Sequence, residues 1–242
     1  MISDSALPVQ THSRRLREKI ELVRPRLHEA AGEVWNHPRL ADLFPDLLYT
    51  IHSAIRATVP TIKAAEACAR SLAAHDPVAA GMVDYLAHHA EEEKDHDEWT
   101  LDDLAVLGVK RAGAWKRIPS PAVAALVGTQ YYWMHHVHPV AYLSYQAVME
   151  GPPSVEFLEY TIERTGLPRE AFGTQFFHAK ADPHHVREFD QMIDGLPLQD
   201  WHHTIMGVNA FQTVELLARV YEDLLERFEA EPPARSAASG TF

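Results

Sequence analysis

A pattern of three side chains, His-x3-acid-x2-His, occurs twice in this chain and constrains its fold more than any other feature. The six residues of the two copies are His89, Glu93, His96, His178, Asp182 and His185. On a helix, positions i, i+4 and i+7 lie on one face, so each copy would direct two imidazoles and a carboxylate to one side. The pattern therefore predicts two helices whose polar faces either meet water or converge on metal.

The spacing within each copy indicates which kind of metal site would fit. Imidazole and carboxylate are ligand types of non-haem iron and manganese sites. The two histidines of a copy would be about 10.5 Å apart along the helix axis, at ~1.5 Å per residue, which is too far for both to bind one ion. Two ions ~3.5–4 Å apart, with the central acid reaching between them, suit this spacing. The interpretation is a dinuclear metal site; a polar surface is the alternative.

The rest of the chain reads as helical, because it has no sustained alternation of apolar and polar residues. We expect one all-α domain over residues 1–230 and a disordered tail, rich in Pro, Ser and Ala, over 231–242. Capping residues stand before Pro77 and Pro121, and Gly108 is expected to end a helix. The expected helices cover 11–35, 77–99, 101–108, 121–134, 139–150, 153–165, 168–181, 183–194 and 199–229, with further starts at Pro45 and Pro60.

Charge and cysteine content restrict the partners and the compartment. The 242 residues carry a net charge of −12 and a pI near 5.7, which disfavours nucleic acid and anionic membranes. Cys68 is the single cysteine, so an intramolecular disulfide is excluded. No signal peptide or membrane-spanning run is present in the sequence, and we expect a cytoplasmic protein. The expected partners are a small-molecule substrate and, in a homodimer, a second copy.

The second copy and a third helix leave alternatives open. Asp182 precedes Pro183, so it is either a ligand or the N-cap of a new helix, and the segment could order only on metal binding. Glu150 ends an apolar helix, where a carboxylate opposes the helix dipole, so it is either a bridging ligand or simply exposed. Tyr142 and Tyr145 precede it and either pack in the core or line a substrate pocket.

Taken together, these residues resemble the haem-oxygenase-like diiron oxidases and oxygenases, whose fold of about seven core helices is shared with haem oxygenase and the TenA thiaminases. The resemblance extends over about residues 38–225, and His-x3-Asp-x2-His is its most specific element. It implies two iron ions (or manganese), O2 as co-substrate, and oxidation of a small amino- or carboxylate-bearing metabolite in specialised metabolite biosynthesis, by N-oxygenation, C–C cleavage or nitrile formation. The implied metal ligands are His89, Glu93, His96, Glu150, His178, Asp182 and His185, with Glu93 and Glu150 also catalytic.

One departure from the family and three rival functions remain. Many members carry glutamate where this chain has His89, and others use the position of Glu93, so either or both of these residues could bind metal. A ferritin-like or storage-type metal protein would use the Glu-x2-His and Asp-x2-His parts of the motifs and leave His89 and His178 unexplained. A TenA-like metal-free hydrolase would need Cys68 as its nucleophile. A haem protein would use a single histidine, such as His28.

Overall fold

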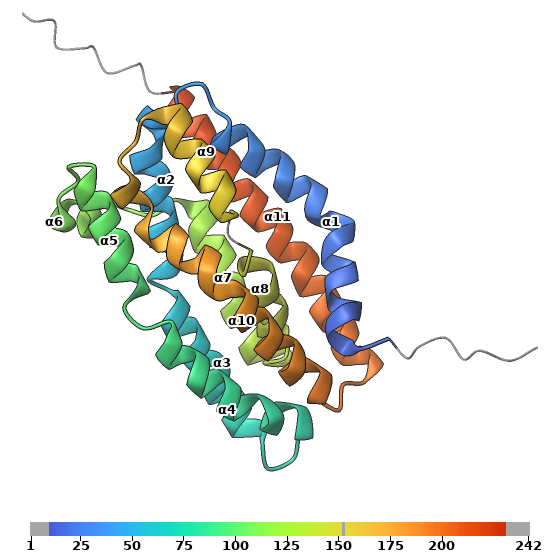
Figure 1. Ribbon diagram of the computed structural model, residues 1–242. Helices are drawn as coiled ribbons and strands as arrows, with labels where there is room; N and C mark the ends of the chain where they lie inside the picture. Colours follow the sequence, from blue (N-terminus) through green and yellow to red (C-terminus); the bar gives the residue numbers. More distant parts are fainter. Residues whose placement is uncertain (1–9, 152, 231–242) are drawn as a thin grey trace, which may run out of the picture.

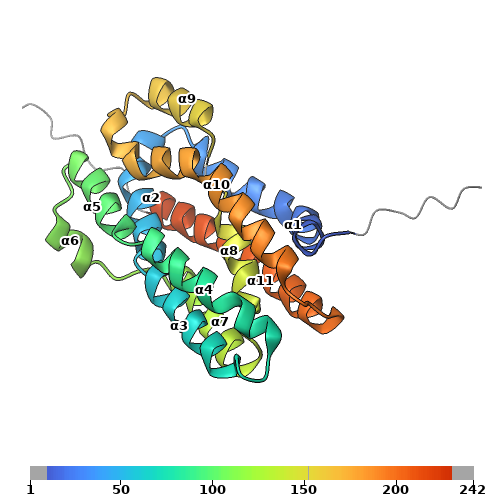
Figure 2. The ribbon, with the colours of Figure 1, turned by 60° about the horizontal axis from the view of Figure 1, so that its bottom comes forward.

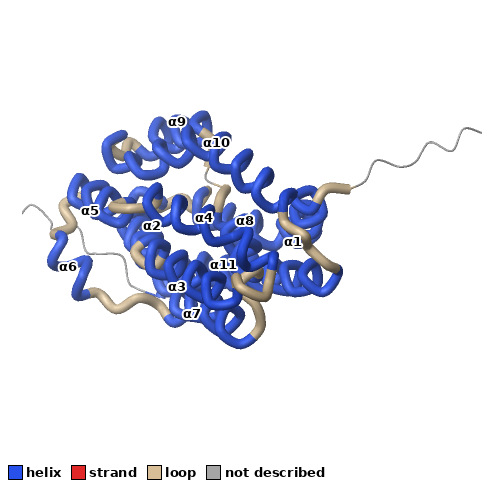
Figure 3. Tube along the Cα trace, turned by 90° about the horizontal axis from the view of Figure 1, so that it is seen from below, coloured by secondary structure: helices blue, strands red, loops and turns tan. Residues whose placement is uncertain are grey.

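The computed structural model describes residues 10–151 and 153–230, without the side chains of 181–184. Every regular element within these residues is a helix (Figure 3). Seven of the α-helices have 15 or more residues, which agrees with the expected all-α fold. The predicted tail, 231–242, lies outside the described residues. The elements are α1 (His12–Trp35), α2 (Leu40–Ile55), α3 (Thr58–Leu72), α4 (Pro77–Glu92), α5 (His96–Val106), α6 (Arg111–Lys116), α7 (Pro121–His136), α8 (Ala141–Met149), α9 (Val155–Thr165), the 3-10 helix η1 (Arg169–Phe172), α10 (Gly173–Gly195) and α11 (Asp200–Ala230).

Local capping signals set several helix ends as expected. Asp76 and Ser120 accept hydrogen bonds from backbone N–H groups of the first turns of α4 and α7. Pro77 and Pro121 occupy the first helical positions, where a missing N–H costs nothing. Gly108 follows α5 with φ of +82°, a left-handed conformation that glycine adopts freely. These predictions are confirmed.

Two prolines that were expected at helix boundaries lie inside helices. Pro45 lies within α2 and does not begin it. Pro183 lies within α10, so the expected helix break and the N-cap interpretation of Asp182 are both wrong. An interior proline is destabilising by about 3 kcal/mol, and tertiary packing offsets it here. Phe176 and Phe189, one on each side of this proline, are 7% and 1% exposed.

The helix expected over 77–99 is instead two helices joined by a short turn. The first, α4, ends at Glu92, and α5 begins at His96, so the segment expected to form a separate helix over 101–108 is the continuation of α5. Three successive glutamates, 91–93, stand at the end of α4, where carboxylates oppose the negative pole of the helix dipole. Asp95 then adopts a left-handed conformation with φ of +67°. The run of polar residues that contains Glu93 and His96 of the first motif copy therefore also interrupts the helix expected over 77–99.

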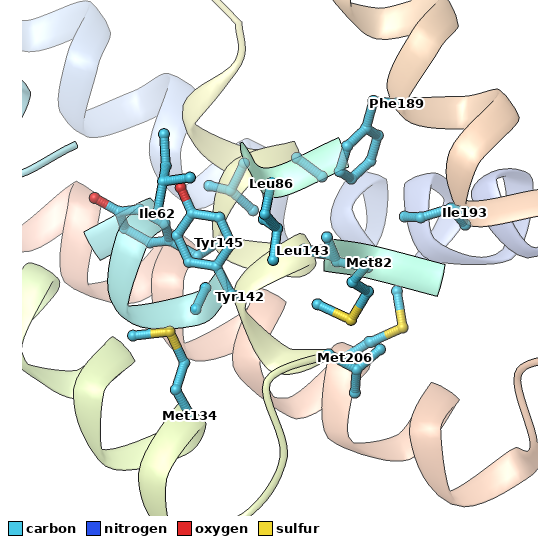
Figure 4. Close-up of a cluster of buried hydrophobic side chains, with 14 of the residues drawn as sticks. Ile62, Met82, Leu86, Met134, Tyr142, Leu143, Tyr145, Phe189, Ile193 and Met206 are labelled. Carbon is cyan, nitrogen blue, oxygen red and sulfur yellow. The ribbon is translucent and has the colours of Figure 1, made fainter. Parts of the chain in front are cut away.

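The helices enclose two apolar clusters, and α10 contributes to both. α1 packs along α11, and α3 packs against α4 (Figures 1 and 2). The first cluster gathers side chains of α3, α4, α7, α8, α10 and α11, and Figure 4 shows Leu86, Leu143 and Phe189 turned toward one another within it. The second joins α2, α5 and the 3-10 helix, and it includes Phe176 of α10. None of the described helices has both the length and the apolar character needed to cross a bilayer.

A buried carboxylate fixes α10 relative to α5. Asp103 of α5 is 4% exposed and accepts hydrogen bonds from the backbone N–H groups of Gly173, at 3.1 Å, and Thr174, at 2.9 Å. These donors belong to the first turn of α10, where helices leave N–H groups unpaired. A Cβ at Gly173 would lie 2.7 Å from Asp103 Oδ1, so the close approach requires glycine. This cap sets the position of one motif copy relative to the other.

Candidate metal centre

The helices that carry the two motif copies pack together, with α4 and α5 against α10 (Figure 2). His89 lies in the last turns of α4, Glu93 follows that helix, and His96 is the first residue of α5. The predicted single stripe on one helix is therefore wrong for this copy. His178 and His185 lie on α10, whose continuous helix preserves the expected spacing.

One half of the site, called here the first half, consists of Glu93, His96 and His178. A carboxylate oxygen of Glu93 lies 3.0 Å from Nδ1 of His96. The rings of His96 and His178 are 4.9 Å apart between centroids and meet edge to face. The His96 residue is 1% exposed, and the Glu93 side chain 11%. The turn between α4 and α5 therefore still brings the acid and the imidazole of the first copy to α10.

The second half consists of His89, Glu150 and His185. Nε2 of His89 lies 3.9 Å from a carboxylate oxygen of Glu150, the residue that ends α8. The His89 and His185 rings are 6.4 Å apart between centroids. The Glu150 side chain is only 15% exposed, so the interpretation of simple exposure is wrong. The residue that follows a third helix, α8, thus brings a carboxylate close to His89, and its role as a metal ligand stays a prediction.

The two halves lie close enough for the charge of one to affect the other. The charge of Glu93 acts on His178 within the first half and on His89 in the second. Burial, followed by the charges of Tyr145, Glu93 and Glu150, raises the pKa of Tyr142 far above its usual value. Tyr142 is therefore near a carboxylate of each half. The side chain of Asp182, the remaining predicted ligand, lies outside the described residues.

The surroundings of His89, Glu93 and His178 favour the protonation states that metals require. Burial lowers the pKa values of His89 and His178 below their usual value, which keeps both imidazoles neutral. For Glu93, burial acts to raise the pKa, but the contact with His96 and the neighbouring histidines outweigh it, so the pKa is lowered overall. Neutral imidazole and ionised carboxylate are the ligand forms of these side chains.

Unpaired buried atoms provide the test of whether these residues fit a metal. Nε2 of His96 and Nε2 of His178 are buried and form no hydrogen bond with any described residue. Leaving a buried polar atom without a partner costs about 1–3 kcal/mol. An imidazole nitrogen that carries no proton is a common metal ligand, and imidazoles with carboxylates form the donor set of non-haem iron. The described residues therefore fit a metal centre.

Three contributing residues were not predicted from the sequence. Gln146 donates hydrogen bonds from its side-chain amide to Glu150, at 2.7 Å, and to the hydroxyl of Tyr85, at 2.5 Å. Tyr85 also stacks on His89, with 5.8 Å between ring centroids. Glu92 approaches His89 and His185 at 3.7 Å and 4.0 Å. A signal was available for Glu92 alone, which shares the helical stripe of His89 at position i+3.

Aromatic side chains surround the site on two sides. Tyr142 and Tyr145 are 1% and 5% exposed and belong to the first apolar cluster (Figure 4), so their packing role is shown, and a pocket role remains a prediction. Trp99 and Phe177 flank His96, at ring distances of 4.4 Å and 5.3 Å, and are 37% and 42% exposed. The first half of the site is thus separated from solvent by an aromatic pair.

A group of Asp76, His138 and His202 also has its ligand atoms within 4.8 Å of one another, but its hydrogen bonds oppose metal binding. Nδ1 of His138 accepts from the N–H of Val140, at 3.1 Å, and Nδ1 of His202 accepts from the N–H of Gln199, at 2.9 Å. A neutral imidazole that accepts at Nδ1 carries its proton at Nε2. Neither Nε2 therefore has a lone pair for a metal, and the group joins the starts of α4, α8 and α11.

Comparison with known proteins agrees with the geometry. The profile of a family described as iron-containing redox enzymes matches residues 43–210, a span that contains both motif copies and Glu150. The chain belongs to the iron-containing redox enzyme family. The resemblance noted in the sequence is thereby confirmed, and iron becomes the metal expected from the family. Among curated proteins, none matches the chain.

Solved structures confirm the fold of this family member. A domain of unknown function with a heme oxygenase-like fold from Shewanella denitrificans OS217 superposes with a TM-score of 0.74 at 17% identity, covering 89% of this chain and 92% of that one. A TenA homolog from Pseudomonas syringae pv. tomato DC3000 gives a TM-score of 0.68 at 12% identity, covering 88% and 92%. At these identities the similarity establishes the fold and leaves the chemistry to the site.

Proposed function

We propose that this family member is a non-haem diiron oxidase or oxygenase that uses O2 to oxidise a small metabolite bearing an amine or a carboxylate. The observation that carries the proposal is the convergence of both motif copies and Glu150 on one buried site. Four helices, α4, α5, α8 and α10, contribute to it. The unpaired imidazole nitrogens of His96 and His178 support the proposal, because both imidazoles lie beside carboxylates of this site.

The two halves of the site divide the ligands between two ions. Iron bound there would supply the redox chemistry that activates O2, and manganese is the second metal that this donor set accepts. His89 and Glu93 both lie within the site, so we assign ligand roles to both. The proposed ligands are His89, Glu93, His96, Glu150, His178, Asp182 and His185.

The surrounding residues would orient the ligands and keep water out. The Gln146 amide holds one oxygen of Glu150, and this bond fixes the direction of the carboxylate. Glu93 and Glu150 are the proposed catalytic carboxylates, because each can accept a proton from a substrate bound beside the ions. Tyr142 and Tyr145 exclude water on the side of the apolar cluster, where we propose that they line the substrate pocket.

Anaerobic loading with Fe(II), followed by measurement of bound iron per chain, tests the proposal. We expect two ions in the wild-type protein and fewer in the His178→Ala variant. His136→Ala is the matched control, because His136 is an exposed histidine on α7, a helix without site residues, and it should still bind two. Wild-type binding well below two ions, or unchanged binding in His178→Ala, would contradict the dinuclear site.

Two of the three rival functions, the storage protein and the TenA-like hydrolase, make different predictions for the same protein. A storage protein would accumulate more than two iron ions per chain. A TenA-like hydrolase requires Cys68, whose Sγ lies 3.4 Å from Nδ1 of His135. This pair joins α3 to α7, which carry none of the proposed ligands, and burial raises the pKa of the thiol. A protonated thiol is a weak nucleophile, so the structure disfavours the hydrolase.

A further inference from the structure

The end of α4 gathers more negative charge than the proposed ligand set uses, because Glu92 lies outside that set. Glu92 and Glu93 stand at the C-terminal end of this helix, where the dipole already disfavours carboxylates. Their side chains are 28% and 11% exposed, so solvent screens them only in part. The ion pairs that they form with described residues all involve histidines. A further carboxylate, Glu188 of α10, has its oxygen within 4.8 Å of that of Glu92.

Glu92 lies between the two imidazoles of the second half. One of its carboxylate oxygens, Oε2, is 3.7 Å from Nδ1 of His89. The other, Oε1, is 3.3 Å from Nε2 of the exposed His88 and 4.0 Å from Nε2 of His185. Nε2 of His89 faces Glu150 on the opposite side of the ring. A carboxylate beside Nδ1 favours the tautomer with its proton there, which leaves the lone pair at Nε2 available to a metal.

The charge balance of the proposed site favours an additional carboxylate at the position of Glu92. Two divalent ions carry four positive charges, and the proposed ligands Glu93, Glu150 and Asp182 carry three negative ones. Burying an uncompensated charge is costly. His89 is a neutral ligand and adds no negative charge. Glu92, one turn later on the same helix, supplies a fourth.

We propose that Glu92 completes the second half of the metal site, anchoring His89 through Oε2 and offering Oε1 to the ion at His185. The inference rests on the proposed function, since it presupposes bound metal. It assigns a role to a carboxylate outside the predicted motif, three positions beyond His89.

Equilibrium dialysis with Fe(II) under anaerobic conditions, fitted to two sites, tests the inference by metal binding and not by turnover. In Glu92→Gln the shape is kept and the charge is lost, so we expect one ion to bind as in wild type and the other about 10–100-fold more weakly. Glu92→Asp should recover part of this loss. Glu91→Gln is the matched control, because Glu91 is an exposed neighbour at the same helix end and pairs with Lys94.

The outcomes separate the two proposals. Two ions bound by Glu92→Gln with wild-type affinity would overturn the role of Glu92 and leave the diiron proposal standing. An equal loss in Glu91→Gln and Glu92→Gln would also overturn it, because the effect would then be one of general charge. Failure of the wild-type protein to bind two ions would refute the proposed function itself. Circular dichroism of each variant verifies that it is folded.

Discussion

Asp103 offers the sharpest test of how the fold positions the metal site. Its carboxylate caps the first turn of α10 from α5, through the N–H groups of Gly173 and Thr174. His96 stands at the start of α5, and His178 lies five residues beyond Gly173. Replacing Asp103 by alanine therefore removes the bond that sets the distance between the two motif copies, without touching any proposed ligand.

The expected cost follows from the two donors, of which Thr174 is buried and Gly173 is exposed. The buried N–H of Thr174 costs about 1–3 kcal/mol when it is left without an acceptor, whereas the N–H of Gly173 can bind water. Part of this is recovered, because Asp103 is itself a buried carboxylate whose pKa is raised mainly by burial. We expect a net loss of about 2 kcal/mol in the free energy of unfolding. For a chain of this size, at ~2–4 °C per kcal/mol, Tm should fall by about 4–8 °C.

Thermal unfolding followed by circular dichroism measures this change, and Fe(II) binding by the folded variant shows whether the site loosens with it. Asp102→Ala is the control, because Asp102 is 67% exposed and pairs with Arg111 at the surface, an interaction worth about 0–1 kcal/mol. Gly173→Ala should mimic Asp103→Ala, since its Cβ would meet Asp103 Oδ1 at 2.7 Å. Equal stabilities of the Asp102 and Asp103 variants would refute the reasoning.

Two further predictions concern the opposite end of α4 and its neighbours. Asp76→Ala should lower the free energy of unfolding in urea by about 2–3 kcal/mol, because it removes a helix cap and leaves the buried Nε2–H of His138 without its acceptor; a change under about 0.5 kcal/mol would contradict the capping role. The metal-free protein should lose stability as the pH falls. Burial lowers the pKa of His202 below its usual value and lowers the pKa of His203 to about 4. Below about pH 6.5 the unfolded chain therefore binds more protons than the folded chain. The stability that these histidines contribute above that pH is lost as the pH falls toward about 4. An equal Tm at about pH 7.5 and about pH 5 would argue against this.

The sequence predicted those features that depend on neighbouring residues. The caps at Asp76 and Ser120 act on the N–H groups that follow them, and both are observed. Pro45 and Pro183 were misassigned, because a proline can begin a helix or lie within one, and distant packing decides between the two. The buried contacts of Glu150 with Gln146 and His89 join separate helices, and no local pattern specifies them.

Each motif copy adopts the helix geometry that its sequence predicted for the other copy. The copy expected to form one regular stripe is broken by a left-handed turn at Asp95, and the copy expected to break at Pro183 is continuous. Both departures occur where α4, α5 and α10 meet. Three clustered glutamates end one helix, and aromatic packing on both sides carries the other through a proline. The proposed metal site therefore depends on tertiary contacts that override helix propensity in both copies. Glu92, on the last turn before the break, is the residue that this geometry leaves beside His89 and His185.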